Sequence, residues 1–304
     1  MCLYPRIIPN KRYEPNISNG GFPPEAKDKR LTCISAGCGK CIECRKQKAR
    51  EWQVRLNEEI RDDDRGLFMT MTFSDEALEK FKEEDPNEVA TKAIELFRKR
   101  WYKKYKEGIK HWLVTELGHD NTERLHLHGI LWTDKTCEEI EKVWQYGWVD
   151  TGKYVNEQSV GYITKYVSKA DEKHPEYISK TFATKGLGRG FLSRYEAKHN
   201  AYKGRDTQRY YKTPKGFKIA LPLYYQNKLW TDEQKEELRL QKLDEKIVYV
   251  RGERIDISTI DGLREYGDAL EYHQRISERL GYTKNPWSKK THKKARKYLD
   301  NQKK

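Results

Sequence analysis

Two histidines, His126 and His128, stand two residues apart in a run from Arg124 to Trp132. Large apolar residues and the histidines alternate over most of this run, which predicts a β-strand. Residues two apart point to the same face of a strand, so both imidazoles are expected to project together, roughly 7 Å apart at the backbone. Such a pair suits metal ligation, although a lone His-x-His is more often an ordinary part of a strand.

A carboxylate is predicted to lie beside these histidines. A second strand is expected from His111 to Leu117, and the turn at residues 118–123 joins it to the histidine strand as a hairpin. Glu116 is then close enough to complete a ligand set with His126 and His128. Two imidazoles and one carboxylate leave positions open for a substrate oxygen, and they suit Mg²⁺ or Mn²⁺ as well as softer ions. The alternative for Glu116 is an exposed carboxylate on a strand.

A short repeat, tyrosine then two residues then lysine, runs from Tyr162 to Lys169. At helical spacing, Tyr162 and Tyr166 lie one turn apart on one face, and Lys165 and Lys169 follow at the same interval. A phenol with a pKa near ~10 is a poor nucleophile at neutral pH, but a nearby ammonium or metal ion stabilises the phenolate. The alternative is an amphipathic helix with packed tyrosines. The lysines and the histidine strand in the same chain favour catalysis.

Four cysteines follow a C-x4-C-x2-C-x2-C spacing: Cys33, Cys38, Cys41 and Cys44. Thiolates at two-residue gaps can close around a tetrahedral zinc ion, with Cys2 or Cys33 as the fourth ligand. The spacing also resembles part of a ferredoxin cluster run, but the proline after the last cysteine is absent. Scattered free thiols are the other alternative. Disulfides are not expected in the cytosolic compartment that the rest of the sequence indicates.

The composition favours a polyanionic partner. The 304 residues include 61 Lys and Arg against 47 Asp and Glu, a net charge of +14, and the mean hydropathy is −1.04. An excess of this size is typical of nucleic-acid binding, and 36 aromatic residues (20 Tyr, 8 Trp and 8 Phe) offer rings on which bases can stack. The sequence shows neither a signal peptide nor an apolar run of membrane-spanning length, so we expect a soluble cytosolic protein.

The elements predicted around these residues define the fold class. In order they are a strand at 66–73, a helix at 86–105, the two hairpin strands, a helix from about 137, a short strand near 148–149 and a helix at 157–170. This order fits an α+β fold with a mostly antiparallel central sheet flanked by helices. We expect this domain at residues 63–200. A proline-rich extended arm, the cysteine segment and a basic helix precede it at 1–62, and a mainly helical basic auxiliary region with a lysine-rich end follows at 201–304.

Further nucleic-acid contacts are predicted outside the hairpin. The helix expected at 43–61 carries Arg45, Lys46 and Arg50, which could follow a phosphate backbone or simply form a solvated face. Arg189 lies among three closely spaced glycines at 186, 188 and 190. That stretch can form a backbone nest for a phosphate, or a plain flexible turn.

Three motifs together resemble those of a known family. His126-Leu127-His128-Gly129 resembles the HUH motif of rolling-circle replication initiators, the repeat at 162–169 resembles their tyrosine motif, and residues 68–73 resemble their first, structural motif. The motifs occur in the family's order within residues 30–200. The resemblance is strongest to replication-associated proteins of microviruses, the small single-stranded DNA phages. Their N-terminal cysteine and Gly-Cys-Gly-Lys-Cys-like stretch, here residues 37–41, favour Cys2 as the fourth zinc ligand.

The resemblance implies an HUH endonuclease with an RRM-like sheet. Mg²⁺ or Mn²⁺ would be held by Glu116 and the two histidines, while Tyr162 or Tyr166 nicks single-stranded origin DNA, leaving a 5′-phosphotyrosine and a free 3′-OH. The sequence contains no helicase P-loop, so a host helicase and polymerase are expected as partners in the bacterial cytoplasm, with no small-molecule cofactor. The alternatives are a relaxase or transposase of the same chemistry, a non-enzymatic zinc-stabilised nucleic-acid-binding protein, and a metallohydrolase that leaves no protein on the DNA.

Overall fold

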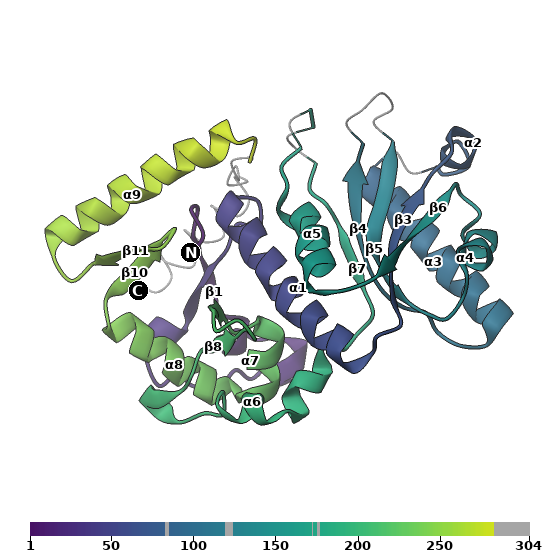
Figure 1. Ribbon diagram of the computed structural model, residues 1–304. Coiled ribbons are helices and arrows are strands. Elements are labelled where there is room, and N and C mark those ends of the chain that lie inside the picture. Colours follow the sequence, from purple (N-terminus) through teal and green to yellow (C-terminus); the bar gives the residue numbers. More distant parts are fainter. Residues whose placement is uncertain (83–84, 119–123, 172, 175–176, 283–304) are drawn as a thin grey trace. The chain divides into compact units, whose positions relative to one another are not determined.

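The structure is a computed structural model that describes residues 1–82, 85–118, 124–171, 173–174 and 177–282 (Figure 1). The chain divides into two compact units. One unit contains Lys46–Asn200 and Arg209–Tyr225, and the other contains Met1–Arg45, Ala201–Gln208 and the chain from Gln226 onward. The lysine-rich end expected at residues 289–297 and the hairpin turn at 119–123 lie outside the described residues.

The larger unit is built on a five-stranded sheet. Its strands lie in the order β6-β3-β5-β4-β7, and every neighbouring pair is antiparallel. The predicted α+β class with a mostly antiparallel central sheet is therefore confirmed. The strands are β3 (Gly66–Thr72), β4 (Lys110–Leu117), β5 (Leu125–Trp132), β6 (Val149–Tyr154) and β7 (Thr181–Ala183).

Helices cover both faces of this sheet (Figure 1). On one face α3 (Pro86–Tyr105) and α4 (Cys137–Trp144) bury a large aromatic and aliphatic core. On the other face α5 (Glu157–Ser168) and α1 (Ile42–Asp62) pack on a second core. Helix α3 begins where the sequence predicts, because the Asp85 side chain caps it and proline occupies its first position. The smaller elements of this unit are α2 (Asp75–Leu78), α6 (Tyr195–Lys198), β8 (Tyr210–Lys212) and β9 (Lys218–Ala220).

The central strands β4 and β5 approach each other closely at Gly129. A Cβ atom at this position would lie 2.1 Å from the carbonyl oxygen of Trp112 and 2.8 Å from the Cα of Leu113. Only glycine fits there without a shift of the backbone. The identity of Gly129, the residue after His128, is thus fixed by packing.

The smaller unit combines short hairpins with helices. Strand β1 (Arg6–Pro9) pairs with β2 (Cys33–Ala36), and β10 (Ile247–Val250) pairs with β11 (Glu253–Asp256). The helices are α8 (Asp232–Asp244), α9 (Ile260–Arg279) and α7 (Leu223–Leu229), which runs from one unit into the other. The predicted extended arm at the N-terminus is more ordered than expected. Leu3 is fully buried and Leu31 is 2% exposed, so these apolar side chains tie the arm to a core.

No helix in the described part of the chain is long and apolar enough to cross a membrane.

Candidate active site and cysteine cluster

Strand register brings the predicted ligands to one face of the sheet. Glu116 on β4 lies directly opposite His126 on β5, and His126 also faces Thr72 of β3. His128 lies two residues along β5, opposite Thr70. Alternate residues of a strand share a face, so both histidines and their partners belong to the face that α5 covers.

Glu116 connects the histidine strand to the lysine of the tyrosine helix. Its carboxylate lies 2.9 Å from Nε2 of His128 and accepts a hydrogen bond of 2.8 Å from Nζ of Lys169. Burial alone would raise the pKa of Glu116, but the contacts with His128 and Lys169 outweigh burial and the pKa falls below its usual value. The carboxylate is therefore held ionised, the form that ligates cations.

Backbone and hydroxyl partners orient the two imidazoles. Nδ1–H of His126 donates to the carbonyl oxygen of Arg124 at 2.7 Å, which leaves the lone pair on Nε2. Burial lowers the pKa of His126 and favours its neutral form, although this hydrogen bond opposes the shift. Nδ1 of His128 lies 3.3 Å from the hydroxyl of Thr70. A fixed tautomer and ring orientation are what metal-binding histidines require.

Helix α5 carries both tyrosines to this face. The ring of Tyr166 stacks on His128 with centroids 4.4 Å apart and planes inclined by 7°. The hydroxyl groups of Tyr162 and Tyr166 lie 2.9 Å apart, and Tyr162 is 52% exposed. Burial, the hydrogen bond with Tyr162 and the charge of Glu116 raise the pKa of Tyr166. A phenolate at Tyr166 therefore needs added positive charge, because its present surroundings disfavour ionisation.

Each lysine of the repeat lies near the ring of the tyrosine that precedes it in the sequence. Nζ of Lys165 lies 6.0 Å from the centre of the Tyr162 ring, and Nζ of Lys169 lies 5.9 Å from that of Tyr166. Each phenol is thus paired with one ammonium group.

The possible ligand atoms of Glu116 and His128 are spaced as two ligands of one divalent metal ion would be. His126 lies farther from them. Neighbouring ligands of an octahedral ion with bonds of about 2.1 Å are separated by about 3 Å, close to the 2.9 Å found between Glu116 and His128. The rings of His126 and His128 are 6.3 Å apart. Among the described residues, this trio does not bring three ligand atoms within 4.8 Å of one another. His126 would have to turn toward the other two to complete a site.

A second set of ligands lies in the smaller unit. The Sγ atoms of Cys2, Cys38, Cys41 and Cys44 all lie within 4.8 Å of one another. Cys2 and Cys41 are 4.0 Å apart and Cys38 and Cys44 are 3.9 Å apart, close to the ~3.8 Å edge of a tetrahedron with metal–sulfur bonds of about 2.3 Å. This cluster could hold a metal ion such as zinc. Cys33 lies on β2 outside the set.

The loop around these cysteines supports thiolates. Backbone N–H groups of Tyr4 and Cys38 donate to Sγ of Cys2 at 3.3 and 3.2 Å, and the N–H of Cys41 donates to Sγ of Cys38 at 3.2 Å. A Cβ atom at Gly37 would lie 3.1 Å from Sγ of Cys44. The Gly-Cys-Gly-Lys-Cys stretch is therefore shaped around the sulfur atoms.

The remaining predicted residues lie elsewhere. Arg45 is only 3% exposed, with its guanidinium 5.3 Å from the ring centre of Tyr282, so its burial does not fit the predicted contact with a phosphate backbone. Lys46 is half-buried and Arg50 is exposed on α1, while Arg189 is exposed at the start of a short 3-10 helix. Cys137 is half-buried on α4 and donates to the carbonyl oxygen of Val149, away from the other cysteines.

Sequence reasoning missed the threonines of β3. Thr70 contacts His128, and Thr72 exchanges hydrogen bonds with the backbone of exposed Trp148 beside the site. The alternation Phe-Met-Thr-Met-Thr-Phe carried the signal, since it places both threonines on one face. Which face that is follows only from the pairing of β3 with β5.

Comparison with known proteins finds similarity to replication-associated proteins. Residues 66–171, which contain the sheet histidines and the tyrosine helix, match the model of a family of replication-associated proteins of the ORF2 type. Replication-associated protein VP4 of Bdellovibrio phage phiMH2K is 25% identical over 229 residues, covering 66% of this chain and 69% of the relative. Replication-associated protein ORF2 of Spiroplasma virus 4 is 28% identical over 315 residues, covering 90% and 94%. No solved structure matches significantly. The predicted resemblance to replication-associated proteins of phages is confirmed.

Proposed function

We propose that this protein is a rolling-circle replication initiator that nicks and rejoins single-stranded origin DNA through a phosphotyrosine. The observation that carries the proposal is the continuous contact from Glu116 to His128, from His128 to the Tyr166 ring, and from Tyr166 to Tyr162. Ligands for a cation and two nucleophile candidates thus lie together on one rigid sheet face. The match of residues 66–171 to a replication-associated family supports the biological role.

The chemical step exchanges one phosphoester for another. The phenolic oxygen of Tyr162 or Tyr166 forms a bond to phosphorus as it gives up its proton, and the bond from phosphorus to the 3′ oxygen breaks. That oxygen takes up a proton and leaves as a free 3′-OH, while the 5′-phosphate stays on the tyrosine. The number of phosphodiester bonds is conserved, so rejoining needs no ATP. Glu116 and His128, with His126 once its ring turns toward them, would hold a Mg²⁺ or Mn²⁺ ion, which would supply positive charge to the scissile phosphate.

The residues of α5 prepare the nucleophile. Lys165 and Lys169 place an ammonium group 6.0 and 5.9 Å from the ring centres of Tyr162 and Tyr166. Lys169 is already paired with Glu116, so the positive charge that a phenolate at Tyr166 needs would come from the bound cation. Because the two hydroxyl groups are hydrogen-bonded to each other, either oxygen can reach the same phosphate position. This arrangement suits an alternating scheme in which one tyrosine opens the origin and the other cuts after a round of synthesis.

A denaturing gel tests this proposal. Protein, Mn²⁺ and labelled single-stranded DNA from its own genome are mixed, with Tyr162→Phe, Tyr166→Phe and the double variant alongside. We expect a slow, protease-sensitive adduct that persists in each single variant and disappears in the double. Cleavage without an adduct would instead indicate a metallohydrolase, and no cleavage would leave a non-enzymatic nucleic-acid-binding protein. A relaxase or transposase would form the same adduct but on strands other than the replication origin.

For the cysteine cluster we propose a structural zinc ion. Cys38 and Cys41 belong to the same buried core as Leu3, Ile42 and Val250, so metal binding and folding of that unit should be coupled. We expect one zinc per chain and a marked loss of melting temperature on chelation. Cys2→Ser should lower the zinc content, whereas Cys33→Ser, the matched control outside the set, should retain it. The opposite result would make Cys33 the fourth ligand, and visible absorption of an iron–sulfur cluster would exclude zinc.

The biological setting follows from the same proposal. The initiator acts in the cytoplasm of a bacterial host, where a host helicase unwinds the nicked duplex and a host polymerase extends the free 3′-OH.

A further inference from the structure

A basic cavity lies at the end of β4 farthest from Glu116. Its volume is about 720 Å³, within the range of about 300–1,000 Å³ typical of ligand sites. Four segments of the larger unit line it: α1, α3, the chain that enters β4, and the chain that follows β7. The lining side chains that the argument uses are Arg98, Tyr102, Lys110, Lys185 and Arg189.

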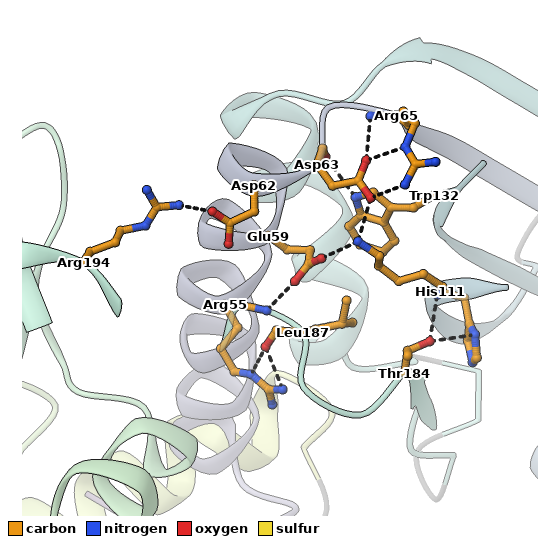
Figure 2. A network of polar contacts seen from close by, with 12 residues as sticks. Arg55, Glu59, Asp62, Asp63, Arg65, His111, Trp132, Thr184, Leu187 and Arg194 are labelled. Carbon is orange, nitrogen blue, oxygen red and sulfur yellow. Dashed lines mark hydrogen bonds and ion pairs between the residues drawn. The ribbon is translucent and has the colours of Figure 1, made fainter. Parts of the chain in front are cut away.

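The two carboxylates that line this cavity, Glu59 and Glu95, already have cationic partners. Glu95 pairs with Lys99 at 2.6 Å on the same helix. Glu59 accepts from Lys110 at 2.8 Å and from the backbone N–H of Gly188 at 2.6 Å. Figure 2 shows the same pattern at the end of α1, where Asp62 contacts Arg194, and in the next residue, Asp63, which contacts Arg65. The glycine-rich stretch predicted as a phosphate nest therefore already binds an anion, the Glu59 carboxylate.

The remaining cations point to a ligand from outside the fold. Within the described part of the chain, Arg98, Lys185 and Arg189 have no carboxylate partner, and all three are exposed on the wall of the cavity. Three uncompensated charges converging on one hollow attract a polyanion. Tyr102, which is 61% exposed, adds an aromatic face beside them. Phosphate-binding cations next to a ring are the two elements of a single-stranded nucleic-acid site.

We infer that this cavity is a second binding site for single-stranded nucleic acid, in which Arg98, Lys185 and Arg189 hold backbone phosphates and Tyr102 stacks a base. The run of β4 from Lys110 to Glu116 separates it from the tyrosine site by roughly 20 Å at ~3.4 Å per residue. That distance corresponds to about six stacked nucleotides. The inference rests on the proposed function, since it gives the nicked strand a second anchor. It also gives a role to Arg189, a residue that takes no part in the tyrosine chemistry.

Equilibrium binding tests this inference without covalent chemistry. A fluorescein-labelled twelve-nucleotide oligothymidylate is titrated into the full chain carrying Tyr162→Phe and Tyr166→Phe, at several salt concentrations. Adding Arg98→Gln, Lys185→Gln and Arg189→Gln should weaken binding at least tenfold and reduce the salt slope by about 2, because each lost phosphate contact removes ~0.7. A control triple variant, Lys92→Gln, Lys103→Gln and Lys142→Gln, removes the same charge from exposed positions outside the cavity and should keep the slope.

Tyr102 gives a second, local readout. Tyr102→Ala should weaken binding about tenfold, while Tyr102→Phe keeps the ring and should bind normally. Ultraviolet cross-linking of a 5-iodouracil-containing strand should label the peptide that holds Tyr102. Equal losses in the cavity and control triples, or cross-links only outside the lining segments, would overturn the inference. Displacement of the strand by micromolar thymidine monophosphate would also overturn it, because the ligand would then be a free nucleotide.

The inference and the proposed function can fail separately. An adduct in the nicking assay together with unchanged binding by the cavity variants would remove only the second site. Loss of binding in the cavity variants without any adduct would retain the cavity as a nucleic-acid site on a non-enzymatic protein.

Discussion

The two ends of strand β4 have opposite electrostatic designs. At the Glu116 end, one carboxylate is shared between His128 and Lys169, and Tyr162 is left half exposed beside them. At the Lys110 end, Glu59 and Asp63 hold the lysine inside the fold. The negative charge at the first end would serve the proposed metal ligand set, whereas the carboxylates at the second end are neutralised by Lys110 and Arg65.

The difference teaches how one rigid strand can support two tasks. The Glu116 end gathers groups able to do chemistry from β4, β5 and α5. The Lys110 end neutralises its acids and leaves the basic side chains of other segments free to attract a strand. A nicking site needs few, well-oriented groups, while an anchoring site needs charge and a ring.

The largest effect on the molecule is expected from Gly129→Ala, because this position packs against the middle of β4 and a change there disturbs both ends of the strand. The new Cβ would lie 2.1 Å from the Trp112 carbonyl oxygen, so β4 and β5 must separate. We expect a loss of about 3 kcal/mol in the free energy of unfolding, measured by denaturant titration. Gly108→Ala, where no atom lies within 4 Å of the new Cβ, is the matched control and should be nearly neutral. Equal stability of both variants would show that the sheet is not as tight here as described.

A substitution at the Glu116 end should lower nicking and leave binding of single-stranded DNA in the cavity almost unchanged. His128→Ala removes the group that contacts both Glu116 and the Tyr166 ring. The rate of nicking should fall at least ~100-fold, because the cation loses a ligand and Tyr166 loses the ring on which it stacks. Binding of oligothymidylate should change less than about threefold, because the cavity end is untouched. A parallel loss of binding and nicking would mean that the two ends are not independent.

The smallest effect concerns acid stability at the Lys110 end. Hydrogen bonds from Arg65, and further ones from Lys110, hold the pKa of Asp63 below its usual range against the opposing effect of burial. A lowered folded-state pKa contributes stability above the unfolded value of about 3.9, and this contribution is lost as pH falls below it. Asp63→Asn should therefore flatten the decline of melting temperature below about pH 4, a difference of about 3 °C or less.

The control for this prediction is Asp134→Asn. Asp134 also faces Arg65, at 3.5 Å, but its side chain is 73% exposed. This variant should keep the wild-type acid profile, and an identical flattening in both variants would contradict the role given to Asp63.

How much of this could be predicted differs between the two ends. Glu116, His126 and His128 lie within a single hairpin, so strand periodicity and hairpin pairing were enough to bring them together. The tyrosine helix was predicted from its spacing, and only its place over His128 required the structure. The incomplete approach of His126 could not be predicted, because ring orientation depends on local hydrogen bonds such as that to Arg124.

The cavity end was not predictable because its residues come from distant segments. Arg98 lies on α3 and Lys185 follows β7, and neither has a local pattern that sets it apart from other basic residues. The glycines around Arg189 were singled out, but their partner, Glu59, lies 129 residues earlier in the chain. Likewise, the spacing of the cysteines left Cys2 and Cys33 as alternatives, and only the folded N-terminus brings Cys2 to the other three.

The most direct test of the central claim is mass spectrometry of the protein after reaction with origin DNA and nuclease digestion. Trypsin cleavage after Lys165 places Tyr162 and Tyr166 on different peptides, so each can be examined for a linked nucleotide. We predict a 5′-phosphonucleotide on Tyr162 or Tyr166 in the wild type, and on the remaining tyrosine in each single Phe variant. A nucleotide on any other residue, or cleaved DNA with both peptides unmodified, would contradict the account.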